Sequence, residues 1–129
     1  MENEFTWEIN EDHPVYNIRH RAFYFSKSII EFISQVTYDR IHHSLFDQLP
    51  RSATSIGANL VEGIAGVSNK DFINYNAIAL KSANETKYWL CLIKETKLAD
   101  KEIMDKLIKE ADEISKIIAT IIINLKKRK

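Results

Sequence analysis

The stretch from Ser52 to Leu90 constrains the fold more than any other part of the chain. It reads SATSIGANLVEGIAGVSNKDFINYNAIALKSANETKYWL and joins two segments with helical spacing through a turn that contains Gly63 and Gly66. Within it, Ser, Asn and Glu stand at positions where apolar residues would be expected to face a core. A core-facing stripe with polar members is either a hydrogen-bond network that specifies the fold or a functional site.

Four segments of the chain carry stripe residues at spacings of three, four or, once, seven, which is the period of one helix face. In chain order these positions are Ile18, Ala22, Phe25, Ile29, Phe32 and Val36; Leu45, Leu49, Ala53, Ile56 and Leu60; Phe72, Tyr75, Ala79, Ser82, Thr86, Trp89 and Ile93; and Ile103, Leu107, Ile114, Ile118, Ile121 and Leu125. Four helices with short connections predict an all-α fold, an antiparallel up-down four-helix bundle. With only three Gly and two Pro, the chain has too few turn residues for a β-sandwich or barrel.

Polar residues mark the expected starts of the last three helices. Ser44 with Asp47, and Ser68 with Asp71, have the spacing of capping boxes. Asp100 suits the N-cap of the last helix. Helix boundaries are therefore expected just after each of these positions.

The two prolines bear on the first two helices. Pro14 suits the first turn of the first helix, where a missing N–H costs nothing. Pro50 lies inside the second pattern, and it removes a backbone donor and crowds the preceding turn. It predicts a kink or a restart of that helix.

Length and charge limit the possible partners. The 129 residues suit a single domain, and we expect an acidic extension over residues 1–13, with five carboxylates and no Lys or Arg, followed by the bundle over residues 14–129. The whole chain balances 18 basic against 18 acidic residues, so no global field attracts nucleic acid or an anionic membrane.

Cys91 is the only cysteine, so an intramolecular disulfide is impossible and a reducing, cytoplasmic location is expected. Its place between Leu90 and Leu92 predicts a small buried apolar side chain rather than a nucleophile. No apolar run reaches the roughly 20 residues of a membrane-spanning helix. The N-terminus also lacks the basic and apolar regions of a signal peptide.

The apolar faces of the first and last helices are broader than a lone bundle needs. A core-facing helix uses about three apolar positions per heptad. The first helix adds Phe23 and Ile30, and residues 117–123 of the last helix cover most of its circumference. Monomers usually avoid such exposed patches, which predicts a homo-oligomer. The alternative is that Lys and Glu stems or the tail cover these residues.

Six polar residues form the candidate site. They are Ser52, Ser55, Asn59 and Glu62 on one face of the second helix, and Ser82 and Glu85 on the third. A structural interpretation makes them a network that satisfies buried groups and fixes helix register. A catalytic interpretation makes Glu62 and Glu85 an acid–base or metal pair. No His, Cys or further carboxylate clearly completes such a set, so we expect no catalytic residue, metal, cofactor or small-molecule substrate.

Sequence motifs for other chemistry are missing. None of the four histidines follows a Glu by three residues, as a di-iron bundle requires. No phosphate-binding loop, dinucleotide fingerprint or nucleophile elbow occurs. RNA or DNA binding would rest on a basic rim, for which a solvated face is the alternative. That rim would comprise Arg19, Arg21, Arg40, Arg51, Lys126, Lys127, Arg128 and Lys129.

The residues of this motif also suggest a family. SATSIGANLVEG, then Ser68-x-x-Asp71-Phe72, then IALKSANETKYWL over residues 78–90 resemble the bacterial four-helix bundle proteins of the 23S rRNA intervening-sequence family. The resemblance covers residues 14–126 and is specific over 52–90, while Pro50 departs from the pattern. The motif positions are Ser55, Asn59, Glu62, Gly63, Ser82 and Glu85, which the resemblance marks as structural hallmarks.

The resemblance implies an up-down bundle that assembles into a ring-like homopentamer without established enzymatic activity. A related branch resembles the accessory subunit of diversity-generating retroelements, a basic pentamer that binds nucleic acid and a reverse transcriptase. We therefore expect a non-enzymatic homo-oligomeric scaffold or binding module. The alternatives are a nucleic-acid-binding accessory protein that uses the basic rim, and a metal-dependent enzyme that uses Glu62 and Glu85.

Overall fold

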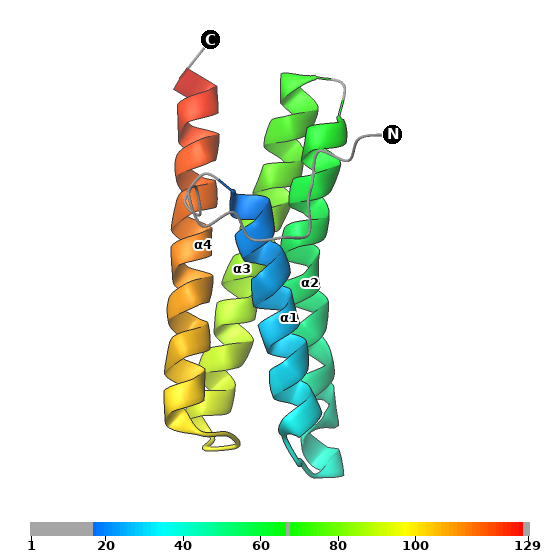
Figure 1. The fold of residues 1–129 in the computed structure, drawn as a ribbon, viewed down its shortest axis with the longest axis vertical. Coiled ribbons are helices and arrows are strands. Elements are labelled where there is room, and N and C mark those ends of the chain that lie inside the picture. The colour runs from blue at the N-terminus through cyan, green and yellow to red at the C-terminus, as the bar shows by residue number, and fades with distance from the viewer. Residues whose placement is uncertain (1–16, 67, 128–129) are drawn as a thin grey trace.

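The computed structural model describes residues 17–66 and 68–127. Over these residues the chain forms four α-helices and a short 3-10 turn, with no β-strand: α1 (Ile18–Gln35), η1 (Arg40–His42), α2 (His43–Ala65), α3 (Asn69–Glu95) and α4 (Lys101–Lys127). Consecutive helices run in opposite directions (Figure 1), as in an up-down bundle. The prediction of an all-α fold is confirmed. Among the described helices, none is both long enough and apolar enough to cross a membrane.

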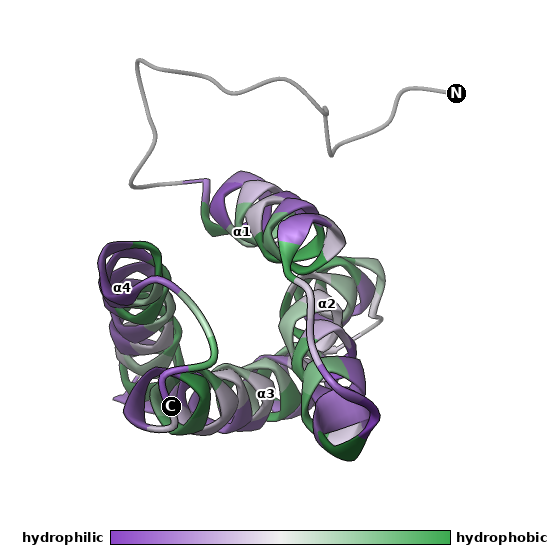
Figure 2. Ribbon diagram, turned by 90° about the horizontal axis from the view of Figure 1, so that it is seen from below, coloured by the Kyte–Doolittle hydropathy of each residue, from purple (hydrophilic) through white to green (hydrophobic). Residues whose placement is uncertain are grey.

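The helices turn their apolar sides toward a common centre. Seen from below in Figure 2, they lie around that centre in chain order, with α2 next to α1 and α3, and α3 next to α4. With the long axis vertical, Figure 1 shows that α1 begins well below the upper ends of α3 and α4. The ring of helices is thus least closed between α1 and α4.

The core consists largely of the stripe positions expected from the sequence. Ile18, Ala22, Phe25, Ile29 and Phe32 are buried in α1. The stripe is also buried at Ala79, Ser82, Thr86 and Ile93 of α3 and at Leu107, Ile114 and Ile118 of α4, whereas the predicted Ile103 is exposed and its neighbour Met104 is buried instead. The second stripe differs at its start, because Phe46 is buried there and Leu45 is only half-buried. The Phe46 ring stacks on Tyr38 at 4.3 Å, which draws that side of α2 inward.

The capping box predicted at Ser44 and Asp47 is wrong. The 3-10 turn Arg40–His42 leads directly into α2, whose first residue is His43, and no side chain caps this end. Asp47 instead forms an ion pair with Arg51 one turn later, at 3.1 Å between Oδ2 and Nε. Since the 3-10 turn already continues into the helix, the chain leaves no extended N-cap position at Ser44.

The sequence predicts a kink or a restart of the second helix at Pro50. The helix α2 does not restart there. Pro50 lies inside the continuous helix, flanked by the buried residues Phe46, Leu49 and Ala53. The hydroxyl of Thr54 donates to the Pro50 carbonyl at 2.8 Å. Packing on both sides therefore outweighs the one backbone hydrogen bond that proline removes.

The predicted starts of α3 and α4 are confirmed. The Asp71 N–H donates to the Ser68 hydroxyl at 3.1 Å, as an N-cap requires. The Glu102 N–H donates to the Asp100 carboxylate at 3.0 Å. Between the two helices, Lys97 adopts a φ of 59°, in the left-handed region that favours glycine. The start of the first helix that the sequence predicts near Pro14 lies outside the described residues. The structure describes α1 from Ile18 onward.

The prediction that Cys91 is buried is wrong, because its side chain is exposed. Leu90 and Ile93 take the inward positions on this turn of α3, and both are fully buried. A residue directly after an inward-facing one points about 100° away around the helix. Cys91 consequently lies on the outer side of the bundle.

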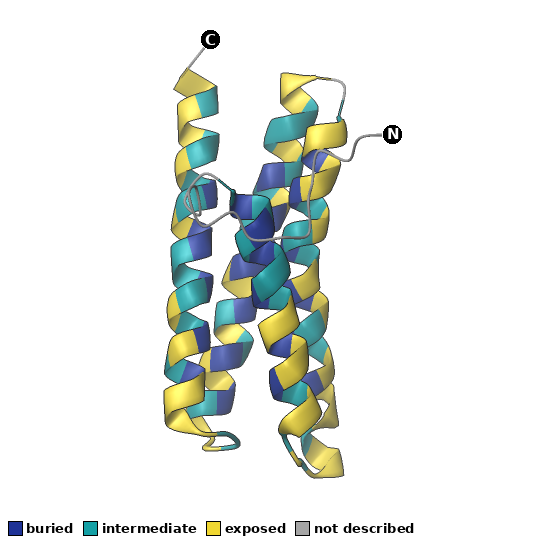
Figure 3. Ribbon diagram, in the orientation of Figure 1, coloured by how far each residue is buried: buried dark blue, intermediate teal, exposed yellow. Residues whose placement is uncertain are grey.

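Large apolar residues remain exposed in the described part of the chain. Figure 3 shows the exposed residues of the ribbon in yellow. Ile30 keeps 50% of its surface accessible and Ile123 keeps 53%, while Ile118 is fully buried. Phe23, Ile117 and Ile121 are half-buried. The single chain therefore does not bury all of the apolar surface noted in the sequence.

Candidate functional site

A chain of hydroxyl groups joins α2 to α3 at the centre of the bundle. Thr86 and Ser52 are hydrogen bonded through their hydroxyls at 2.9 Å, and the Ser52 hydroxyl also lies 3.1 Å from the Leu49 carbonyl, to which it can donate. Thr86 is fully buried and Ser52 is 4% exposed. These groups face each other because the two stripes meet between antiparallel helices.

A second link lies one turn along the same interface. The Ser82 hydroxyl donates to the Ser55 hydroxyl at 2.8 Å, and the Asn59 amide donates to the same Ser55 oxygen at 3.0 Å. The Asn59 amide also bonds the Ser55 carbonyl at 2.8 Å. Ser52, Ser55, Asn59 and Ser82 thus lie in one polar seam between α2 and α3.

The structure does not bring Glu62 and Glu85 into this seam. Both are exposed, and Glu85 accepts a hydrogen bond from the indole N–H of Trp89 at 3.1 Å. Over residues 17–66 and 68–127, no three His, Cys, Asp or Glu side chains lie close enough together to hold a metal ion. Thr86 was missed as a seam residue, although a threonine on an otherwise apolar stripe was the available signal.

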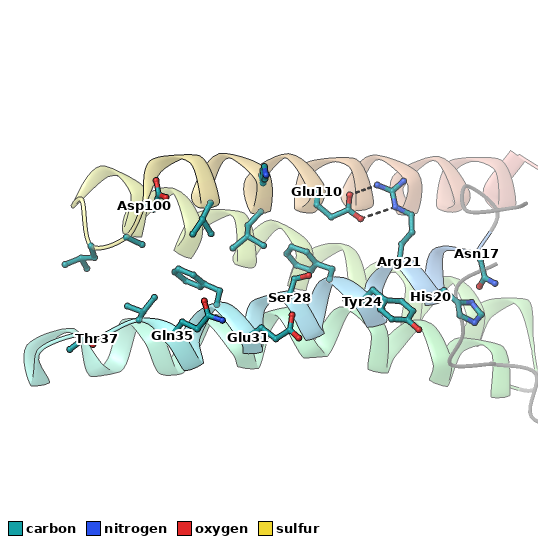
Figure 4. Close-up of a pocket in the computed structure, with 18 residues that line it drawn as sticks. Asn17, His20, Arg21, Tyr24, Ser28, Glu31, Gln35, Thr37, Asp100 and Glu110 are labelled. Carbon is teal, nitrogen blue, oxygen red and sulfur yellow. Dashed lines mark hydrogen bonds and ion pairs between the residues drawn. The ribbon is translucent and has the colours of Figure 1, made fainter. Parts of the chain in front are cut away.

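A long groove separates α1 from α4 (Figure 4). It has a volume of about 990 Å³. Phe25, Phe32 and Leu107 line it, with Ser28, Glu31 and Gln35 along the α1 side. None of the hydroxyls of the polar seam lines this groove, so the two features are separate.

Arg21 links α1 to α4 at one end of the groove. Its guanidinium donates to both carboxylate oxygens of Glu110, at 3.1 and 2.6 Å, and to Glu113 at 2.8 Å. The hydrogen bonds to Glu110 are the largest cause of a raised pKa at Arg21. The same guanidinium lowers the pKa of the Glu113 carboxyl, chiefly by its hydrogen bond. Arg21 is therefore engaged within the chain rather than free for a phosphate.

The basic residues of the predicted rim do not form one surface. Arg40 and Arg51 lie at the end of the bundle where α2 begins, whereas Lys126 and Lys127 end α4 at the opposite end (Figure 1). At 1.5 Å per residue, the length of α4 separates these ends by about 40 Å. Arg128 and Lys129 lie outside the described residues.

Two partly exposed faces combine apolar and charged side chains. The first, which we call the α1 face, comprises Arg19, Phe23, Lys27 and Ile30, at spacings of four, four and three; Lys27 and Ile30 are exposed, and Arg19 and Phe23 are half-buried. The second, the α3 face, comprises the exposed residues Ile78, Glu85 and Leu92, each seven residues apart on α3, together with the exposed Glu62 of the neighbouring helix α2. Ile78 and Leu92 are 44% and 36% exposed. Neither Glu62 nor Glu85 has an ion-pair partner in the part of the chain that the structure describes.

The chain is similar in sequence and in structure to proteins of one family. No curated protein matches the chain. A crystal structure from Bacteroides thetaiotaomicron, described as a protein of unknown function from the S23 ribosomal protein family, is 34% identical in sequence, with a TM-score of 0.76. The match covers 81% of this chain and 97% of that one. The family described as 23S rRNA-intervening sequence protein matches residues 15–120. The chain therefore belongs to the 23S rRNA-intervening sequence protein family.

Proposed function

We propose that the protein is a non-enzymatic scaffold that acts as a homo-oligomer, in which the α1 face of one copy packs on the α3 face of the next. The observation that carries this proposal is the exposure of Ile30, Ile78 and Leu92 on a chain whose core is otherwise well filled. Burying a large apolar side chain contributes roughly 1.5–3 kcal/mol, so a few such residues per contact favour association.

The charges of the two faces are complementary. Arg19 and Lys27 flank the apolar residues of the α1 face, and Glu62 and Glu85 flank those of the α3 face. Opposite charges around an apolar centre give specificity and orientation to a protein interface. A contact between two different faces generates a ring when its rotation closes. The family resemblance implies five subunits.

The polar seam supports a structural role rather than a catalytic one. Its hydroxyl and amide groups bond one another and nearby carbonyls, as in the pair Ser52–Thr86. Ser52, Ser82 and Thr86 are buried, and no residue of the seam lines the groove, so a substrate in the groove would not reach them. The seam instead sets the register of α2 against α3, which fixes where the α3 face lies.

Charge reversal tests the proposed contact. Arg19→Glu with Lys27→Glu makes both faces acidic, and Glu62→Lys with Glu85→Lys makes both basic, so each pair of changes is expected to shift the protein toward monomer in light scattering. All four changes in one chain restore opposite charges and are expected to restore the oligomer. Glu31→Lys with Glu102→Lys, at exposed positions outside both faces, is the matched control. An unchanged mass in both reversed variants contradicts the proposed interface.

Nucleic-acid binding is a second candidate, which the family name supports. It predicts affinity that falls steeply with salt, because bound cations are released from phosphates. The wide separation of Arg51 from Lys126 means that a single short duplex would contact only one of these groups. Fluorescence anisotropy with a labelled RNA hairpin tests this candidate, and no measurable binding at low ionic strength removes it.

A further inference from the structure

The groove between α1 and α4 takes no part in the proposed oligomer contact. We propose that it binds an amphipathic helix of a partner protein, with an apolar stripe toward the groove and basic residues along both flanks. The proposal rests on the shape, lining and charge of the groove and is independent of the proposed oligomer. The residues of the α1 face are different from those of α1 that line the groove, and the α3 face lies on other helices. The proposed assembly therefore leaves the groove open.

The dimensions of the groove suit a helix. Its lining residues on α1 run from His20 to Gln35, and those between Arg21 and Gln35 span about 21 Å, or about four helical turns. A helix of that length fills a cylinder of roughly 1,650 Å³ at a diameter of about 10 Å, so half of it occupies roughly 800 Å³. The groove volume of about 990 Å³ is of this size. Ser28, a small residue halfway along α1, leaves room for a close approach (Figure 4).

The lining of the groove suits the apolar face of such a helix. Phe25, Phe32 and Leu107 form an apolar floor, of which each residue keeps only 3–8% exposed. The apolar surface that a partner can reach comes mainly from Ile103 of α4, which is 43% exposed, and from the half-buried Val36, Leu98 and Ala99. A helix laid in a groove of this kind places anchors at positions i, i+3, i+4 and i+7.

The negative charge around the groove favours a partner helix with basic residues along its flanks. Glu31, Asp100 and Glu110 line it, and Glu113 adjoins Glu110 through their shared partner Arg21. The Arg and Lys residues that line the groove are Arg21 and Lys106, and the Arg21 guanidinium is already engaged by Glu110 and Glu113. The excess of negative charge favours a basic partner and disfavours the acidic residues 1–13 of this chain as the occupant.

A titration with designed peptides tests the proposal. The probe is a fluorescein-labelled peptide of about 18 residues, with Leu at helical spacing and Lys elsewhere, and its counterpart carries Glu in place of Lys. Fluorescence anisotropy is expected to show saturable binding of the Lys peptide and binding roughly tenfold weaker, or none, for the Glu peptide. A peptide with the same Lys and Leu in scrambled order, lacking the apolar stripe, is also expected to bind at least tenfold more weakly.

Two variants place the binding in the groove. Ser28→Trp fills the groove from an exposed position and is expected to weaken binding about tenfold, whereas Asn84→Trp, exposed on α3, leaves it unchanged. Glu31→Lys is expected to weaken binding several-fold, and Glu95→Lys on α3 serves as its control. Circular dichroism of each variant checks that the fold is retained.

Three results overturn the proposal. The first is equal binding of the Lys and Glu peptides, and the second is unchanged binding of the Lys peptide by Ser28→Trp. The third comes from a competition measurement with an apolar fluorescent dye whose binding Ser28→Trp removes. In it, a simple alkylammonium or a peptide of residues 1–16 displaces the dye, but the Lys peptide does not. That result assigns the groove to a small amphiphile or to the chain's own N-terminal segment.

Discussion

At the scale of single residues, the polar seam is the feature on which the arrangement of α2 and α3 depends. Thr86 is fully buried, so its hydroxyl requires a partner inside the protein, and it has two within reach, Ser52 and the Ser82 carbonyl. An apolar pair of the same shape would pack equally well but would not select one register. The seam is therefore a device of specificity more than of stability.

Replacing two members of the seam together is expected to cost less than the sum of the two single replacements. Thr86→Val keeps the shape and removes the hydroxyl, which we expect to lower the free energy of unfolding by about 1–2 kcal/mol. Adding Ser52→Ala to Thr86→Val removes the partner as well, so the further loss is expected to be smaller than that of Ser52→Ala alone. Urea denaturation of the four proteins measures the coupling, and strict additivity contradicts the bond between these hydroxyls.

Ion pairs on α4 contribute to the dependence of folding stability on pH. Lys94 bonds Asp105 at 2.7 Å and lowers the pKa of that carboxyl, as Lys116 and Lys87 lower the pKa of Asp112. A carboxyl whose pKa is lower in the folded state stabilises the fold above its ordinary pKa. That contribution is lost as pH falls from about 4 through the lower folded value.

We therefore expect stability to decline as pH falls below about 4, and Lys94→Met to soften part of this decline. In that variant the pKa of Asp105 is expected to move back toward its ordinary value, which NMR titration of the carboxyl measures directly. Lys81→Met, exposed on α3 and without an ion pair in the described residues, is the control. An unmoved Asp105 titration contradicts the Lys94–Asp105 pair.

At the scale of elements, apolar spacing and capping residues specify most of the helices. Ser68 and Asp100 mark helix starts because each offers an acceptor to an otherwise unpaired first-turn N–H. The start of α2 could not be predicted in this way, because a 3-10 turn and the stacking of Tyr38 on Phe46 set it. Such a start depends on contacts between segments rather than on local sequence. The same limit applies to Pro50, where tertiary packing overrides the local preference.

The turn after α3 contains the one left-handed non-glycine residue among those described, Lys97. Its N–H bonds the Lys94 carbonyl at 3.1 Å, and the next N–H, of Leu98, bonds the Ile93 carbonyl at 3.2 Å. Glycine adopts this conformation without the steric cost of a Cβ, although it also loses more freedom on folding. Lys97→Gly is expected to raise the free energy of unfolding by about 0.5–1 kcal/mol, and Lys97→Ala to leave it nearly unchanged. Thermal and urea unfolding check this, and equal stability of the Gly and Ala variants contradicts the expected gain.

At the scale of the whole molecule, the sequence predicts the bundle and the excess of apolar surface but not the groove. The excess follows from counting apolar positions on each helix, and the exposure of Ile30 and Ile123 agrees with it. The groove depends on how far α1 stands from α4, which the Arg21–Glu110 contact and the start of α1 help to set. Distances between elements of this kind are not encoded in the period of either helix. The spacing of the motif residues likewise predicts that they share a helix face. It does not predict that Glu62 and Glu85 are exposed rather than part of the seam.

The most direct test of the scaffold proposal is the mass of the native protein in solution, measured by light scattering at tens of micromolar. The contact between the α1 and α3 faces predicts an oligomer, and a ring of five has about five times the chain mass of 15.0 kDa. Ile30→Lys, which introduces a charge into the apolar centre of the α1 face, is expected to reduce that mass toward one subunit. A wild-type mass of a single chain at this concentration contradicts the proposed assembly.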